Sequence, residues 1–166
     1  MKVFSYGFMV IIALAIVLAT LPDGSSAQAP RLAWQIQQAA SARAEDNSSV
    51  TLTGKGEFIP GRRDEVAGGG TWMTRGPNGD TLDTGTYSVV ELLSWEEAPS
   101  TASSDLRAGL ATFRIRYSNA KDGILVVSCH LAGTPNSVFE GVTASMGYVQ
   151  FWNKVPSGTL FTVPGN

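Results

Sequence analysis

The feature that most constrains this chain is a repeated unit of glycine, one spacer residue and an aromatic ring. The unit occurs as Gly56-Glu57-Phe58, Gly70-Thr71-Trp72 and Gly85-Thr86-Tyr87, at a spacing of roughly 14–15 residues that is near the strand-and-turn spacing of all-β folds. Residues i and i+2 lie on the same face of a strand. A ring can therefore lie over a bare glycine of the neighbouring strand. The repeat predicts consecutive, paired antiparallel strands.

The second half of the chain continues the strand pattern. Asn78-Gly79 is a strong hairpin signal. Residues 111–117 alternate between apolar and polar side chains, and residues 124–131 are apolar on both faces, as in a central strand. No long helical period separates the strands, which disfavours parallel βαβ units. We expect an all-β fold of about eight strands, a single antiparallel β-barrel, with a β-sandwich as the alternative.

The N-terminus has the pattern of a secretory signal peptide. Lys2 precedes an apolar stretch that is most hydrophobic over residues 9–18, and Ser25-Ser26-Ala27 fits the rule for a cleavage site. We predict a signal peptide over residues 1–27, and hence a secreted or periplasmic protein. An uncleaved membrane anchor is the alternative, because the stretch is close to the ~20 residues that a spanning helix needs. After cleavage we expect no membrane insertion.

The segment that follows the signal is ambiguous. Leu32 and Ile36 lie four residues apart, which is compatible with a short helix over residues 31–44. The alternative is a mobile linker. A polar break follows at residues 45–49. We therefore divide the mature chain into an N-terminal segment, 28–48, and an antiparallel β domain, 49–166.

Composition excludes several classes of protein. The net charge is −2 and charged residues make up 16% of the chain, so we expect no broad basic surface for nucleic acid. Cys129 is the one cysteine, so no disulfide can form within the chain and packing must hold the core.

The sequence carries no catalytic or metal-binding motif that we recognise. Cys129 and His130 are adjacent, but neighbours on a strand point to opposite faces and would not meet. One cysteine and one histidine cannot complete a zinc site, and we expect neither metal nor cofactor. Glu91 and Glu140 lie within apolar strands, and His130 is either a hydrogen-bonded structural residue or a functional one.

Aromatic residues on the expected strands are the best functional lead. In a small barrel such rings either fill the interior or line a ligand pocket. The residues that we nominate for ligand binding are Trp72, Tyr87, Tyr117, His130, Glu140, Tyr148 and Trp152.

The units GKGEF, GGGTW and TGTY, from Gly54 to Tyr87, resemble the repeated glycine–aromatic strands of calycin-like barrels. They are also similar to the strands of allene oxide cyclase and dirigent barrels. Residues 124–131 with 137–152 resemble an uncharacterised group of secreted bacterial proteins. These resemblances imply a barrel architecture, and no catalytic residue follows from them.

Three functions are compatible with this pattern. The first is an exported, non-enzymatic barrel that binds a small, partly apolar ligand. The second is a cyclase or isomerase in which Glu91, Glu140 or His130 moves a proton. The third is an envelope-associated interaction module without a pocket.

Overall fold

Buried and exposed side chains alternate along the strands of this protein, as expected for strands with one face in the core. From Ala111 to Tyr117 the odd-numbered residues are buried and the even-numbered ones are not, as the sequence predicted.

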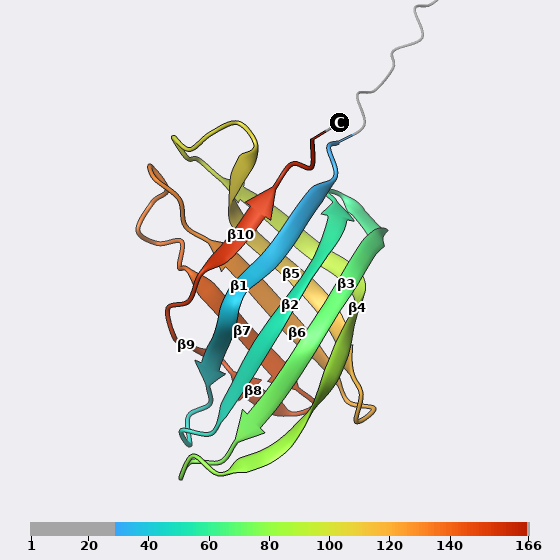
Figure 1. Ribbon diagram of the computed structural model, residues 1–166, viewed down its shortest axis with the longest axis vertical. Helices are drawn as coiled ribbons and strands as arrows, with labels where there is room; N and C mark the ends of the chain where they lie inside the picture. The colour runs from blue at the N-terminus through green and yellow to red at the C-terminus, as the bar shows by residue number, and fades with distance from the viewer. Residues whose placement is uncertain (1–28, 166) are drawn as a thin grey trace, which may run out of the picture.

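The computed structural model describes residues 29–165, so the predicted signal peptide lies outside the described residues. Within 29–165 there are ten strands and no helix (Figure 1), hence none that could cross a membrane. The strands are β1 (Leu32–Arg43), β2 (Ser49–Ile59), β3 (Arg62–Arg75), β4 (Thr81–Ala98), β5 (Leu106–Tyr117), β6 (Asp122–Cys129), β7 (Gly141–Met146), β8 (Val149–Phe151), β9 (Asn153–Lys154) and β10 (Thr159–Thr162).

The strands form one antiparallel sheet that closes into a ring. Their order is β10-β1-β2-β3-β4-β5-β6-β7-β8, and β9 pairs with β1. The ring closes because β10 pairs with β1 on one side and with β5 on the other. The predicted antiparallel barrel is therefore confirmed. The strand count exceeds the expected eight because residues 32–43 form the additional strand β1 and because the last part of the sheet is divided into short pieces, β8 to β10.

Both the short helix over residues 31–44 and the alternative mobile linker are wrong, because this segment is strand β1. Leu32, Trp34 and Ile36 alternate inward; an irregularity between Ile36 and Ala40 then adds two residues to β1, so Ala40 and Ala42 continue inward in the same phase. The spacing of four residues between Leu32 and Ile36 suits a strand as well as a helix, and the irregularity hid the alternation. Strand β1 pairs with β2, β9 and β10, so it is an integral part of the barrel.

Aromatic rings lie against glycines of other strands, as the repeat predicted for Trp72. Trp72 is directly opposite Gly85, and a Cβ atom on Gly85 would lie 3.0 Å from Nε1 of Trp72. Tyr87 pairs with Gly70, but its ring reaches past β3 to Gly54 of β2, whereas Phe58 pairs with Val66. Rings also lie close to glycines at three further pairs, Trp34 with Gly56, Trp95 with Gly109 and Tyr117 with Gly123. Glycine is therefore needed where an aromatic ring packs directly against the backbone of the sheet.

Aromatic side chains fill the interior of the barrel. Phe58 contacts Trp95, Phe113 and Phe161, with ring centroids 5.4, 5.7 and 6.1 Å apart. Trp34 packs on Phe113 at 5.3 Å, and Trp95 packs on Phe161 at 4.8 Å. These distances are those of edge-to-face and offset packing in protein cores. Side chains therefore fill the interior of the barrel, which is a packed core rather than a ligand cavity.

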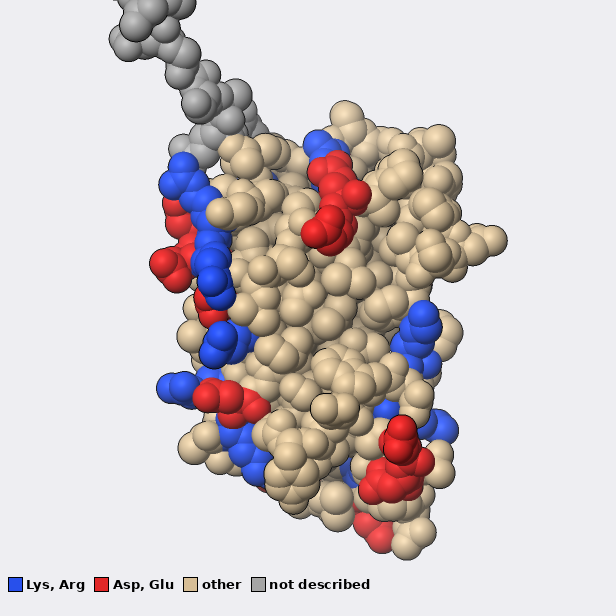
Figure 2. Space-filling view, turned by 180° about the vertical axis from the view of Figure 1, so that it is seen from behind, with Lys and Arg blue, Asp and Glu red and all other residues tan. Residues whose placement is uncertain are grey.

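Charged side chains lie at the margins of the face that is turned away from β1, β2 and β3 (Figure 2). The middle of that face is uncharged. This distribution agrees with the low charge content, 16% of residues.

Candidate functional site

Three of the nominated ligand-binding residues belong to the core. Trp72, Tyr87 and Tyr117 are at most 5% exposed. Each donates a hydrogen bond to a backbone carbonyl of another strand, which for Tyr87 and Tyr117 is two strands away in the sheet. Trp72 Nε1 donates to Thr86 O (2.9 Å), Tyr87 OH to Thr53 O (3.0 Å) and Tyr117 OH to Ser145 O (2.9 Å). Burial raises the pKa of both tyrosines, so they remain neutral donors. These residues hold strands together and face no open cavity.

His130 and Glu140 lie together at one end of the barrel, on the connection between β6 and β7. The carboxylate of Glu140 accepts hydrogen bonds from the backbone N–H of His130, from the backbone N–H of Thr159 (2.6 Å) and from Thr159 Oγ1 (2.9 Å). Nδ1 of His130 lies 2.9 Å from the carbonyl oxygen of Val138. The pair thus ties the connection to β10, which is a structural role.

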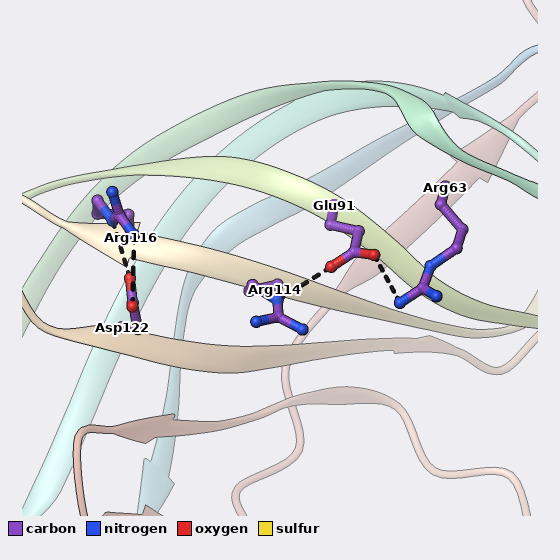
Figure 3. A network of polar contacts seen from close by, with 5 residues as sticks. All are labelled: Arg63, Glu91, Arg114, Arg116 and Asp122. Carbon is purple, nitrogen blue, oxygen red and sulfur yellow. Dashed lines mark hydrogen bonds and ion pairs between the residues drawn. The ribbon is translucent and has the colours of Figure 1, made fainter.

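Glu91 lies on the outer wall, between two arginines (Figure 3). Its carboxylate is 2.6 Å from Nη2 of Arg63 and 3.0 Å from Nε of Arg114. A bulge between Val89 and Glu91 sets the register at which Glu91 is paired with Arg114 and faces outward. The three acid–base candidates, Glu91, Glu140 and His130, are therefore held by structural partners.

Tyr148 and Trp152 lie at the opposite end from Glu140. Tyr148 was expected on a strand, but it lies in the turn 147–148 and is 95% exposed. Trp152 lies between β8 and β9 and is 45% exposed. Of the seven nominated residues, these two have accessible rings.

This end of the barrel is an open mouth surrounded by four short connections. They are residues 44–48, 76–80, 118–121 and 147–148, at the lower end of the barrel in Figure 1. A hollow of about 310 Å³ lies between them. Met146, Val149, Phe151 and Leu82 give it an apolar lining. Met146 and Phe151 are buried, whereas Leu82 is 66% exposed, so Leu82 is the accessible apolar side chain of the mouth.

Polar and charged groups surround this apolar lining. Asp46, Asp83 and Lys121 all border the hollow. Asn119 Nδ2 donates to Asp83 Oδ2 (3.1 Å) and lies 3.8 Å from Sδ of Met146, which links the rim to the floor. Asp46 accepts hydrogen bonds from Oγ and N of Ser48 at 2.6 and 2.9 Å, and these bonds lower the pKa of its carboxyl. The rim therefore has fixed charges of both signs.

A second hollow, of about 390 Å³, adjoins the mouth on the outer side of β8. The two hollows share Asp46 and Val149. Tyr148 and Trp152 line the outer hollow, together with the polar side chains of Glu45, Gln150 and Asn153. We call this outer hollow the aromatic ledge.

A third hollow, of about 450 Å³, lies on the barrel wall over Gly56 and Gly68. Beneath it, the buried Nε1 of Trp34 has no hydrogen-bond partner. A Cβ on Gly56 would lie 2.7 Å from this nitrogen but only 2.1 Å from the carbonyl oxygen of Ala67. Backbone therefore covers the indole, and no ligand atom fits between them. The mouth is the better site.

Comparisons with protein-family models, curated proteins and solved structures found no match. Within residues 29–165, no group of three or more His, Cys, Asp or Glu side chains could hold a metal ion. The site must therefore be interpreted from its own residues.

Proposed function

We propose that this protein binds a small, partly apolar molecule at the mouth of its barrel, without enzymatic activity. The observation that carries the proposal is the mouth hollow, with its apolar lining of Met146, Val149, Phe151 and Leu82 beneath a charged rim. Small-molecule sites typically combine apolar walls with a few polar groups, and barrel mouths are among their usual places. The packed interior restricts the ligand to the mouth.

The alternative of a cyclase or isomerase has less support. It required Glu91, Glu140 or His130 to face a bound substrate, and none of the three lines the mouth hollow. Glu91 is held by Arg63 and Arg114. Glu140 accepts three hydrogen bonds from His130 and Thr159 at the far end of the barrel.

Titration with the apolar dye N-phenyl-1-naphthylamine tests the proposal. We expect saturable fluorescence enhancement, and we expect Leu82→Asp to weaken dye binding about tenfold, because it places a charge in the apolar lining. Leu82 is 66% exposed, so this variant should fold normally. Val90→Asp is the matched control, since Val90 is 48% exposed on β4 outside the mouth and its replacement should leave binding unchanged. Absence of saturable binding by the unaltered protein would support the pocketless interaction module instead.

Export belongs to the same proposal and is supported by the apolar stretch and the cleavage pattern before Gln28. N-terminal sequencing of protein recovered outside the cytoplasm should give a chain that begins at Gln28. A chain retained in the membrane with its original N-terminus would support the anchor alternative.

A further inference from the structure

The aromatic ledge presents two rings whose exposure the fold does not require. Tyr148 follows Gly147, whose φ of +58° forms the tight turn between β7 and β8, and its ring is 95% exposed. Trp152 lies just beyond β8 and is 45% exposed. Large exposed rings that gather beside a hollow indicate a binding surface more strongly than isolated ones do.

The indole of Trp152 is held in place. Its Nε1 donates a 3.0 Å hydrogen bond to Oε1 of Gln150. This bond uses the carbonyl oxygen of the Gln150 amide and leaves its NH₂ group available as a donor. A ring with a fixed orientation loses less conformational freedom when a ligand packs on it.

The polar groups of the ledge comprise both donors and acceptors. Glu45 and Asp46 supply carboxylate acceptors, and Gln150 and Asn153 supply amides. A hydroxyl group donates and accepts at once, so hydroxyl-rich ligands need this mixture beside them. The two carboxylates would repel a phosphate or sulfate group. The ledge has no Lys or Arg among its lining residues to offset that repulsion.

An aromatic face carries partial negative charge, and it attracts the weakly positive C–H groups on the flat side of a sugar ring. Rings, amides and carboxylates together therefore match a neutral saccharide. The ledge and the mouth hollow share Asp46 and Val149, so one molecule can contact both. Their volumes, about 390 and 310 Å³, are each within the range of ligand sites.

We propose that the ligand is a neutral glycosylated amphiphile, whose sugar packs on Tyr148 and Trp152 while its apolar part enters the mouth lined by Leu82 and Met146. This inference depends on the proposed function, because it assigns the mouth to the apolar part. It adds the chemical class of the head group.

Calorimetric titration with three probes below their micelle-forming concentrations tests the inference. The probes are octyl β-D-glucoside, octyl β-D-galactoside and octyl tetraethylene glycol, which share the tail and are all uncharged, but only the first two carry a sugar ring. We expect at least one glycoside to bind about tenfold more tightly than octyl tetraethylene glycol. Trp152→Ala should weaken glycoside binding about tenfold and leave octyl tetraethylene glycol binding unchanged. Trp152→Phe, which keeps a ring, should retain most of the affinity.

The outcomes separate the inference from the proposed function. If all three probes bind equally, or if Trp152→Ala has no effect on the glycosides, the saccharide assignment is overturned while binding at the mouth stands. If none of the probes binds although the dye does, the inference is overturned and the proposed function stands; if the dye fails to bind as well, both proposals are overturned. Leu82→Asp should weaken binding of all three probes, because the tail is common to them.

Discussion

At the scale of single residues, Cys129 shows how burial suppresses a reactive group. Its side chain is fully buried at the end of β6, and its Sγ lies 3.5 Å from the carbonyl oxygen of Thr159. Burial, with a smaller contribution from the nearby carboxylate of Glu140, raises the pKa of this thiol to about 11. In the folded protein Cys129 therefore behaves as a small buried hydrophobic residue.

We predict that Cys129 does not react with a disulfide-exchange reagent at pH 8 in the folded protein, because only the thiolate is nucleophilic. The folded pKa exceeds the ordinary value of 9.0, so the thiol's contribution to stability is complete below pH 9 and is lost as the pH rises towards 11. Absorbance of the released thiol measures the rate. In denaturant the reaction should be fast, and an equally fast reaction of the folded protein would contradict the burial.

Tyr117 provides a second residue-scale prediction. Tyr117→Phe removes the 2.9 Å hydrogen bond to the carbonyl of Ser145 and leaves that carbonyl without its side-chain donor in the core. We expect a loss of about 1–2 kcal/mol in the free energy of unfolding, measured by urea denaturation. Tyr148→Phe, at a side chain that is 95% exposed, is the control and should change stability by less than about 0.5 kcal/mol.

The sequence placed Trp72, Tyr87 and Tyr117 correctly on strands, but it misplaced Tyr148 and Trp152 and did not predict the role of any ring. Trp72 and Tyr117 are core donors, whereas Tyr148 and Trp152 are exposed on the ledge. The roles diverge because a ring's neighbours depend on the register between strands and on where each turn begins. Trp34, one of the largest fully buried side chains, was missed because its segment was expected to be a helix.

At the scale of elements, the contact between β2 and β3 depends on glycine. A Cβ on Gly70 would lie 1.9 Å from the carbonyl oxygen of Thr53 and 2.6 Å from Cα of Gly54. The clashing atoms belong to the backbone, which cannot avoid the clash by changing rotamer as a side chain can. The two strands must move apart to accept any larger residue.

Gly70→Ala should therefore destabilise the protein by about 2–3 kcal/mol or prevent its folding. Gly76→Ala is the matched control in the turn after β3, where the nearest atom would be a Leu82 methyl group at 3.6 Å, an ordinary contact. Chemical denaturation followed by circular dichroism compares the two variants. Equal free energies of unfolding for the two variants would show that β2 and β3 can move apart at little energetic cost.

The position of β5 was predictable from its alternation, and that of β6 from its continuous apolar run. The uncertain positions coincide with irregularities. In β1 the irregularity between Ile36 and Ala40 interrupts the alternation, and in β4 the bulge after Val89 sets the face of Glu91. Such insertions have no composition signal of their own, so a single sequence does not reveal them.

At the scale of the whole molecule, ring closure depends on β1. Leu32, Trp34 and Ile36 contribute to the core, and β1 bridges β2 to β10. A domain starting at Ser49, as the polar break suggested, would lack this strand and would leave β2 and β10 with unpaired edges.

We predict that a chain beginning at Arg31 unfolds in the same cooperative transition as the mature protein, whereas a chain beginning at Ser49 does not fold cooperatively. Thermal unfolding monitored by circular dichroism, together with size-exclusion chromatography, distinguishes them. A cooperative transition for the shorter chain would show that the ring closes without β1.

The barrel was predictable from the sequence, but its filled interior was not. The same strand rings could line a cavity or fill it, and the choice depends on how many of them point inward at the same level. Here Phe58 contacts both Phe113 and Phe161, so these rings fill the interior and do not line a cavity within it.

The four connections around the mouth, the longest of which are residues 44–48 and 76–80, are too short to fold over a guest. A molecule held there keeps one side in solvent, so entry and departure require no gate to open. The dissociation rate of the ligand should then depend on the strength of its contacts alone. Such a protein would suit rapid capture and release of a ligand better than long-term storage.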